Sequence, residues 1–483
     1  MRNMSRLADQ QISFWLGSRR GIGMIGMGVL ACMLPLAIGF VSAKMNPTTS
    51  QQGAILLAIV FPAFLLAILQ SRLLISYTLV VWAVGPEIRR IADWLEGTYH
   101  SVSLLSVAPL LVSSMLIIPV LRGIHLAEKP LTRIAVFFGI ELAYGSVVGL
   151  FKNGIVFAYD LANYVVPLLL LPYLAIKPMK AKELDRLLYS YANIAVLVAI
   201  YGIIQYLTVP PWDAFWMNHV EMNSIGVPEP LQIRVFSSMN SPGPCAIFLA
   251  MALVPMLMEK RWRGTLGWIG VLLTVVCLLV TLVRSAWLIA FVMLLAYILS
   301  SSSKGKWKTL FQLAIVGLLL YIIVPKLPGA EGLVARMQTL TDIQQDHSYN
   351  ERLDLLHTML PAITSNPVGQ GIGSVGIGTK LDNGGDLGEL GIMDNGYIAI
   401  FLTFGICGAF FFFGGLFVII KRLLVRIAER NSSQPYIRLA LATWAGAVAS
   451  LISDNGFPGM RGYLIWMMIG IGLWAKDVIA ERR

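Results

Sequence analysis

Apolar runs of about twenty residues recur along the whole chain and are separated by short polar segments. Residues 21–43, 53–70 and 155–176 form such runs and contain few or no charged side chains. An α-helix rises 1.5 Å per residue, so about 20 residues cross the roughly 30 Å hydrocarbon core of a bilayer. The pattern therefore predicts an all-α fold, that of a polytopic integral membrane protein.

The runs are numerous enough to predict about fourteen transmembrane helices. The run at 73–85 is short for a full crossing. The expected helices are at 22–43, 53–70, 73–85, 101–121, 134–150, 155–176, 187–207, 243–258, 266–283, 285–300, 309–325, 394–420, 438–453 and 462–475.

Composition supports this prediction, because only 13% of the 483 residues are charged and 57% are hydrophobic. Soluble proteins carry about 25% charged residues, so a soluble fold of this composition would lack polar surface to face water. The four cysteines all lie within apolar runs, at Cys32, Cys245, Cys277 and Cys407. They are typical of small buried hydrophobic residues, and we expect no disulfide framework, metal site or cofactor.

The net charge of +11 indicates either a nucleic-acid partner or an excess of basic residues in cytoplasmic loops. With the N-terminus inside, the cytoplasmic loops hold 26 of the 37 lysines and arginines but only 8 of the 26 acidic residues. This asymmetry favours the second interpretation and predicts that both termini are cytoplasmic. We therefore expect no nucleic-acid partner and a functional face on the outer side of the membrane.

Residues 267–300 are apolar except for Arg284, and basic clusters flank them at 260–263 and 304–308. One helix of that length would be ~50 Å long, too long for a single crossing. The sequence thus predicts a helical hairpin with Arg284 at its outer tip. A cation near the membrane is costly and is a functional candidate, with snorkelling to the headgroups as the alternative.

Two outer segments are long, residues 208–242 and 326–393. Loops of this length are usually functional or disordered, and the composition of these two favours ordered structure. Inside the second, Ser348 and Glu351 form a capping-box pattern, which predicts a helix that ends near Asn366-Pro367.

The expected helix after Ser348 is amphipathic, with Leu356, Met359 and Ile363 on one face. Arg352 lies in its first turn, beside free backbone N–H groups that attract anions. Arg352 either strengthens an anion site there or pairs with a neighbouring aspartate.

A glycine-rich stretch follows, Pro367-Val-Gly-Gln-Gly371-Ile-Gly373-Ser-Val-Gly376, and it contains G-x-G-x-x-G. A dinucleotide site would require a preceding strand and a βαβ unit, and here the motif follows a helix on the outer face. We reject that interpretation. A tight turn whose backbone N–H groups approach a phosphate remains open.

Several other polar residues have two interpretations each. Arg234 precedes Asn240 at the entry of a helix and is either functional or an interfacial anchor. Arg461 lies near Asp454-Asn455, where a structural ion pair is favoured. Asp394 and Asn395 open a helix, which either Asp394 or Asn395 can cap.

Two acidic residues, Glu141 and Asp160, fall inside apolar runs, and we expect them to pair with each other or with Lys152. The outer face as a whole carries arginines beside carboxylates. Arginines bind phosphates bidentately, so a lipid-linked diphosphate at the outer leaflet is a substrate that fits this face.

Four motifs occur in the order typical of one family. They are Arg234-Val-Phe-Ser-Ser-Met-Asn240-Ser-Pro-Gly243, Thr281-Leu-Val-Arg284-Ser-Ala-Trp, Arg352 followed by Asn366-Pro-Val-Gly-Gln-Gly-Ile-Gly373, and Asp394-Asn-Gly-Tyr397 with Phe404-Gly405 after it. The set, over roughly residues 230–410, resembles the superfamily of O-antigen ligases and Wzy-type polysaccharide polymerases.

The resemblance implies an inverting, metal-independent glycosyltransferase with a helical membrane fold of the GT-C type. Such enzymes take a glycan from undecaprenyl diphosphate on the periplasmic face of the bacterial cytoplasmic membrane. Polymerases pass it to another lipid-linked repeat unit, and ligases pass it to lipid A core. The resemblance also implies that Arg284 and Arg352 hold the diphosphate, with Arg234, Asn240, Asn395 and Arg461 as further substrate-binding candidates.

The sequence departs from the ligase pattern at one position. Ligases typically carry a histidine before the asparagine that corresponds to Asn395, and this chain carries Asp394. A carboxylate can act as general base where its reach allows, so Asp394 is the candidate that activates or orients the acceptor. The departure favours a polymerase of the O-antigen or exopolysaccharide pathway over a ligase.

A lipid-oligosaccharide flippase or ion-coupled carrier is the third hypothesis, although no internal repeat supports it. The chain divides into N-terminal transmembrane helices, residues 1–230, and a C-terminal region, residues 231–483, that carries the motifs and the outer segment 326–393. The resemblance implies an undecaprenyl-diphosphate-linked oligosaccharide and membrane lipid as partners, and polymerases of this kind often work with a flippase and a chain-length regulator.

Overall fold

The computed structural model describes residues 47–126, 129–220, 222–301, 305–308, 310–311, 315, 347–381, 383, 388, 390–391, 393–429 and 433–475. Within these residues the secondary structure is helical, apart from an isolated bridge between Gly226 and Ile233. The helix expected at 22–43 and most of the one expected at 309–325 lie outside the described residues. The all-α prediction is confirmed for the part of the chain that the structure describes.

The first half of the described chain forms helices and 3-10 turns up to the outer segment at 208. They are α2 (Pro47–Ile68), α3 (Leu73–Glu96), η1 (Leu104–Val107), α4 (Ala108–Ser114), α5 (Ile117–Gly123), α6 (Lys129–Lys152), α7 (Gly154–Leu168), α8 (Leu170–Ile176) and α9 (Ala181–Thr208).

The second half continues with helices on both sides of the second outer segment. They are α10 (Pro211–His219), α11 (Pro242–Met258), α12 (Gly267–Val280), α13 (Arg284–Leu299), α16 (His347–Ser365), η7 (Ile377–Leu381), α17 (Gly396–Ala428), α18 (Gln434–Ser450) and α19 (Gly459–Trp474).

Six stretches of the described chain are long and apolar enough to cross a membrane. They are Ser50–Ile68, Leu104–Leu126, Pro130–Lys152, Val156–Ile176, Ala181–Thr208 and Gly396–Ala428. Three shorter apolar helices, α11, α12 and α13, add to them. The protein is thus a helical membrane protein.

Residues 267–300 form two helices, as the expected hairpin requires. Helix α12 ends at Val280 and α13 begins at Arg284, so the turn between them is short. Leu282 in this turn has a φ of +56°. A single long helix is excluded, and Arg284 is the first residue of α13.

Helix α3 is longer than the expected 73–85 and runs to Glu96. It continues past Pro86 because its charged residues are paired: Arg90 forms an ion pair with Glu87 one turn earlier. Gly97, at φ +66°, ends the helix by donating its N–H to carbonyl groups of the last turn.

Helix α16 has the expected end, at Ser365, but its buried face is rotated from the expected one. Leu355, Met359 and Ile363 pack against the start of α17, whereas Leu356 is 40% exposed. The i, i+4 spacing of residues 355, 359 and 363 therefore defines the packed stripe. The prediction that Leu356 belongs to it is wrong.

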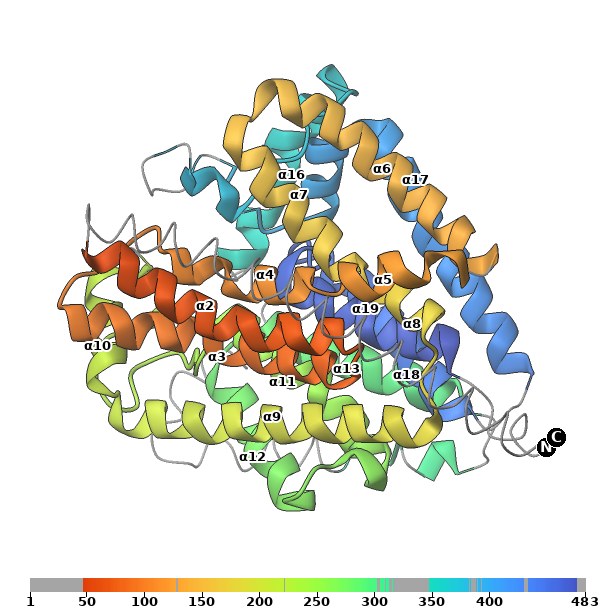
Figure 1. Cartoon of the computed structure of the whole chain (residues 1–483), viewed down its shortest axis with the longest axis horizontal. Helices are drawn as coiled ribbons and strands as arrows, with labels where there is room; N and C mark the ends of the chain where they lie inside the picture. The colour runs from red at the N-terminus through yellow and green to blue at the C-terminus, as the bar shows by residue number, and fades with distance from the viewer. Residues whose placement is uncertain are drawn as a thin grey trace, which may run out of the picture.

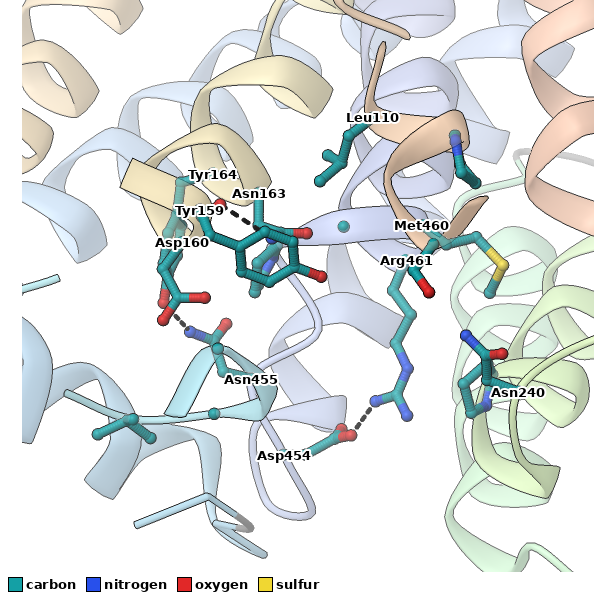
Figure 2. A pocket seen from close by; sticks show the side chains of 18 of the residues that line it. Leu110, Tyr159, Asp160, Asn163, Tyr164, Asn240, Asp454, Asn455, Met460 and Arg461 are labelled. Atoms are coloured by element: carbon teal, nitrogen blue, oxygen red, sulfur yellow. Dashed lines mark hydrogen bonds and ion pairs between the residues drawn. The ribbon is translucent and has the colours of Figure 1, made fainter. Parts of the chain in front are cut away.

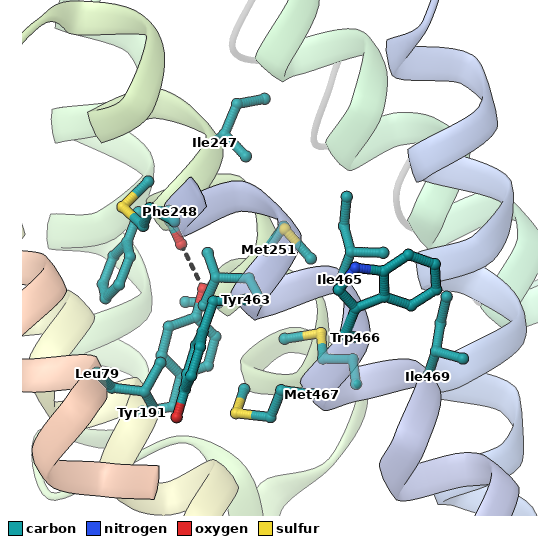
Figure 3. Close-up of a cluster of buried hydrophobic side chains, with 14 of the residues drawn as sticks. Leu79, Tyr191, Ile247, Phe248, Met251, Tyr463, Ile465, Trp466, Met467 and Ile469 are labelled. Atoms are coloured by element: carbon teal, nitrogen blue, oxygen red, sulfur yellow. Dashed lines mark hydrogen bonds between the residues drawn. The ribbon is translucent and has the colours of Figure 1, made fainter. Parts of the chain in front are cut away.

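Helices that are far apart in the sequence pack against one another. Helix α6 runs beside α17, α13 packs on α18, and α18 packs on α19 (Figure 1). Part of the core lies where α9 packs on α3 and α11, and α11 on α19. Leu79, Tyr191, Met251 and Trp466 are buried members of this cluster (Figure 3). The buried Tyr191 hydroxyl donates a hydrogen bond of 2.7 Å to the Phe248 carbonyl, so its polar atom is satisfied inside this core.

Helix α17 is broken at Gly405, whose φ and ψ are 61° and −172°. The break frees backbone groups, and the glycine-rich segment of residues 367–376 pairs with them. The N–H groups of Gln370 and Gly371 donate to the carbonyls of Leu402 and Thr403 at 2.7 and 2.9 Å. Unpaired backbone groups inside a membrane protein are costly, so this pairing makes the break possible.

The same segment is also bound to the helices on its other side. The Ile372 N–H donates to the Gly145 carbonyl in α6 at 3.0 Å, and the Asn153 side chain donates to the Ile372 carbonyl at 2.9 Å. The segment thus joins α6 and α7 to α17, which fixes the distance between these helices.

Residues 208–220 and 222–242 are ordered, as expected, and a buried arginine holds them against α3. Arg90 is 1% exposed and donates to the carbonyls of Ser237 and Met239, each at 2.5 Å. It also forms ion pairs with Glu87 and with Asp213, whose Oδ1 lies 2.9 Å from Nε. A fully buried cation is tolerated only when it is paired and hydrogen-bonded in this way.

Burial raises the pKa of the Asp213 carboxyl, and the neighbouring Arg90 opposes this shift. The Gln205 side chain donates to Asp213 Oδ2 at 2.8 Å and accepts the N–H of Ser237 at 2.8 Å. The network therefore fixes the backbone just before Asn240.

We predict that Gly371→Ala destabilises the protein more than Gly376→Ala. Both glycines have a positive φ, +86° and +109°, which costs a residue with a Cβ about 1–2 kcal/mol. A Cβ on Gly371 would also lie 2.2 Å from the Gly149 nitrogen, whereas the space around Gly376 is open. Thermal unfolding in detergent measures the difference, and equal midpoints for the two variants would contradict the pairing described above.

We also predict that Arg90→Ala lowers the free energy of unfolding by about 3–5 kcal/mol, because it leaves Glu87 and Asp213 buried without their cation. Arg261→Ala is the matched control, since Arg261 is 40% exposed and pairs with Asp185 at the surface. That control should cost about 0–1 kcal/mol. Equilibrium unfolding in mixed micelles compares them, and similar losses would show that the Arg90 network is dispensable.

Candidate functional site

A cavity of about 440 Å³ lies where the two halves of the chain meet. Helices α3, α4 and α7 form its N-terminal walls. The start of α11, the end of the glycine-rich segment, the start of α17 and the turn before α19 complete it. It is therefore built from elements of both expected regions, residues 1–230 and 231–483.

The walls are rich in groups that bind sugars and phosphates. Figure 2 shows Asp160 and Asn455 on one side and Arg461 and Asn240 on the other. The polar lining consists of Arg89, Ser106, Tyr159, Asp160, Asn163, Tyr164, Asn240, Asp394, Thr403, Asp454, Asn455 and Arg461.

Helix α7 contributes the densest polar face. Asp160, Asn163 and Tyr164 follow one another at i, i+3 and i+4, so they share one side of the helix. The Tyr164 hydroxyl accepts a hydrogen bond of 2.9 Å from the Asn455 side chain, and Asn163 donates to the Tyr159 carbonyl at 3.0 Å. This face is held in place by the turn before α19.

The expected pairing of the membrane acids is wrong for the described residues. Asp160 and Glu141 are 9% and 2% exposed, and neither forms an ion pair with the other or with Lys152. Lys152 Nζ instead lies 3.4 Å from the Gly369 carbonyl, within the glycine-rich segment. Asp160 lines the cavity, and Glu141 does not.

Arg461 forms the expected ion pair with Asp454 across the turn before α19. Its Nη2 lies 3.2 Å from the position that a Cβ on Gly243 would take, so the start of α11 leaves room for the guanidinium. Both members of the pair line the cavity together with Asn240. The ion pair is therefore confirmed, and it belongs to the site.

Asn395 caps α17, because its Oδ1 accepts the N–H of Ile398 at 3.1 Å. Asp394, the residue before it, is exposed and lines the cavity. Gly396 allows this approach, since a Cβ there would lie 2.5 Å from the Asp454 carbonyl oxygen. Capping thus explains Asn395, whereas Asp394 is part of the cavity lining.

The other predicted arginines lie elsewhere. Arg234 donates to the carbonyls of Ser224 at 3.0 Å and Thr281 at 3.3 Å, so it joins the outer segment 208–242 to the α12–α13 turn. Arg284 begins α13 beside this turn, and neither arginine lines the cavity. Arg352 lies in the first turns of α16, and its side chain is outside the described residues.

The glycine-rich stretch does not form the phosphate-binding turn that the sequence left open. The N–H groups of Gln370, Gly371 and Ile372 all donate to backbone carbonyls of α17 or α6. Those of Ser374 and Gly376 donate to carbonyls nearby. The glycines allow the backbone of this stretch to pack closely on the backbones of α6 and α17. The stretch therefore does not present a series of unpaired N–H groups to a phosphate.

Arg89 is a cavity residue that the sequence analysis missed. It lies on the part of α3 beyond the expected end at 85, and its Nη1 donates to Ser106 Oγ at 3.2 Å. Its Nε is 3.7 Å from Asp93 Oδ2. The adjacent pair Arg89-Arg90 directly after an apolar run was the signal that could have found it.

Asp93, Glu96 and His100 next to Arg89 form a group with metal-ligand chemistry, with ligand atoms within 4.8 Å of one another. His100 Nδ1 lies 3.0 Å from Asp93 Oδ1 and 3.8 Å from Glu96 Oε2. Arg89 lies on the same cluster through its contact with Asp93, so the geometry fits a network of polar contacts as well as a metal site.

The site therefore combines two arginines, three carboxylates, amides and tyrosine hydroxyls inside an apolar helical bundle. Such a lining can bind an anionic head group and the hydroxyls of a sugar, and a carboxylate within it can accept a proton. The search of curated proteins found no match to this chain. A family model described as O-Antigen ligase matches residues 269–413. This segment contains Arg284, Arg352, Asp394 and the glycine-rich segment, and over it the chain is similar to that family.

Proposed function

We propose that this protein is a polysaccharide polymerase of O-antigen or exopolysaccharide biosynthesis. It would join oligosaccharide repeat units carried on undecaprenyl diphosphate at the outer face of the bacterial cytoplasmic membrane. The observation that carries the proposal is the polar cavity between α7, α17 and α19, formed in part by the segment that matches the family. The donor would be lipid-linked, so a site within a membrane bundle suits it.

The proposed reaction is an inverting transfer that requires no metal ion. The acceptor hydroxyl attacks the anomeric carbon of the donor, and the diphosphate leaves with the electrons of the broken bond. Arginines stabilise the charge that develops on the leaving group. We assign this role to Arg284 and Arg352 from the family pattern, with Arg234 as a weaker candidate.

The cavity supports two additions to this assignment. Arg89 and Arg461 are the arginines that line it, and Asn240 lies beside Arg461. They would contact the donor head group or its first sugar. Asp394, exposed at the cavity, would orient the acceptor, and Asn395 would support it as the cap of α17.

The finer topology is part of the proposal. We infer about fourteen spans in a GT-C-like arrangement, both termini in the cytoplasm, and the cavity open to the periplasm, with the distribution of lysine and arginine as the supporting observation. A flippase that delivers the repeat unit and a chain-length regulator would be its partners.

A ligase is the second candidate, and the description of the matched family favours it. It would use the same donor and pass the glycan to lipid A core. Asp394, in place of the histidine typical of ligases, is the observation that leads us to prefer the polymerase.

The deciding assay combines purified protein with a synthetic undecaprenyl-diphosphate oligosaccharide of the native repeat, in the presence of EDTA. We expect a ladder of longer lipid-linked products, because one substrate serves as donor and acceptor. Transfer only after lipid A core is added would identify a ligase. Movement of the substrate across a vesicle membrane without any glycosidic product would contradict both enzyme candidates and identify a carrier.

We predict that Arg89→Ala and Arg461→Ala each slow polymer formation about tenfold or more, since a charge-assisted hydrogen bond contributes about 1.5–3 kcal/mol. Arg284→Ala and Arg352→Ala should also abolish full-length polymer in cells that lack the native gene. Arg261→Ala, a surface control away from the cavity, should leave the product ladder unchanged.

The pattern of losses separates the two arginine sets. Loss in all four variants supports one extended donor site. Wild-type polymer from both Arg89→Ala and Arg461→Ala would show that the cavity does not hold the donor, and wild-type polymer from Arg284→Ala and Arg352→Ala would remove the roles taken from the family pattern.

A further inference from the structure

Asp160 is an acidic residue in the cavity for which neither the sequence nor the family pattern supplies a role. It lies in the middle of α7, is 9% exposed and points to the cavity beside Asn455 (Figure 2). Among the described residues it forms no ion pair and no hydrogen bond. An ionised carboxylate in such surroundings lacks the partners that normally stabilise it.

The other carboxylates of the cavity differ from Asp160 in this respect. Asp454 is paired with Arg461, and Asp394 is exposed to solvent. A substrate hydroxyl that enters the cavity would therefore find its strongest unsatisfied acceptor at Asp160. Tyr164 and Asn163, one turn along the same face of α7, supply further polar groups for a sugar.

The fold makes room for this carboxylate. Gly378, in the short helix η7 after the glycine-rich segment, lies against it, and a Cβ there would be 2.6 Å from Asp160 Oδ1. The backbone pairing of that segment with α6 and α17 holds Gly378 in place. Helix α7 therefore carries the carboxylate, and η7 closes the space beside it.

We propose that Asp160 is the catalytic residue that accepts the proton of the acceptor hydroxyl, an inference that rests on the proposed glycosyl transfer. The hydroxyl oxygen bonds to the anomeric carbon as its proton moves to the Asp160 carboxylate. The bond from the anomeric carbon to the phosphate oxygen breaks, and its electron pair leaves on undecaprenyl diphosphate. Asp394 then orients the acceptor at the mouth of the cavity.

The test uses the full-length protein in detergent and the lipid-linked oligosaccharide of the polymerase assay. Asp160→Asn should lower the turnover rate by about 10²–10⁴-fold, the usual contribution of general acid–base catalysis. Donor binding, measured by isothermal titration, should be unchanged. Thermal stability should be equal or higher, because the amide removes a buried acid without a partner.

Glu141→Gln is the matched control, since Glu141 is also a buried acid, lies on the adjacent helix α6 and does not line the cavity. It should keep the wild-type rate. Gly378→Ala tests the position of the carboxylate without altering its charge, and it should lower turnover in the same way as Asp160→Asn. It also carries the test if Asp160→Asn does not fold.

The outcomes distinguish this inference from the function on which it rests. Wild-type turnover in Asp160→Asn, or a loss confined to donor binding, would overturn the role of Asp160 and leave the polymerase intact. A larger loss in Asp394→Asn than in Asp160→Asn would assign proton transfer to Asp394 instead. A wild-type protein that forms no glycosidic bond with either acceptor would overturn the proposed function and this inference together.

Discussion

The exchange of backbone hydrogen bonds between the glycine-rich segment and the broken helix α17 is the interaction on which the rest of the structure depends. The break at Gly405 exposes the Leu402 and Thr403 carbonyls inside an apolar bundle, where unpaired polar groups are costly. Residues 370 and 371 satisfy these carbonyls, and Ile372 binds α6 on the opposite side. The chain that continues from this junction forms the cavity wall at Gly376, Gly378 and Asp394.

A second polar junction, around Arg90, fixes the opposite wall. Arg90 binds the carbonyls of Ser237 and Met239, and Asn240 follows them at the cavity. Both junctions pair most of their buried polar groups through hydrogen bonds or ion pairs. Asp160 lines the cavity between them and forms no hydrogen bond or ion pair with any described residue. This contrast is the reason for our proposal that the cavity is a chemical site.

Much of the fold could be predicted from the sequence, because membrane-spanning helices appear in it as hydrophobic runs separated by charged segments. The local sequence pattern predicted the helix break before Arg284, the end of α16 near Pro367 and the Arg461–Asp454 pair. The length of α3 could not be predicted in this way. Charged residues such as Arg90 indicate a loop, unless it is known that Arg90 has a buried partner, Asp213, more than a hundred residues away in the sequence.

The site itself was only partly predictable. Asp394, Asn240 and Arg461 were expected and do meet at one cavity, whereas Arg284 and Arg234 lie outside its lining. Arg89 and Asp160 come from the N-terminal half, for which the sequence predicted nothing beyond spanning the membrane. The role of the glycine-rich stretch was also not predictable. The same glycines can bind a phosphate or allow two backbones to pack closely, and which of these occurs depends on the helix that they contact.

The most direct test of the central claim is an electron cryo-microscopy structure of the protein with a lipid-linked oligosaccharide whose acceptor hydroxyl is replaced by hydrogen. Such a donor binds but cannot be extended. We expect density for the first sugar in the cavity beside Asp160, with the diphosphate near Arg89 or Arg461. Density for the diphosphate and sugar elsewhere, with the cavity empty, would contradict the proposed site.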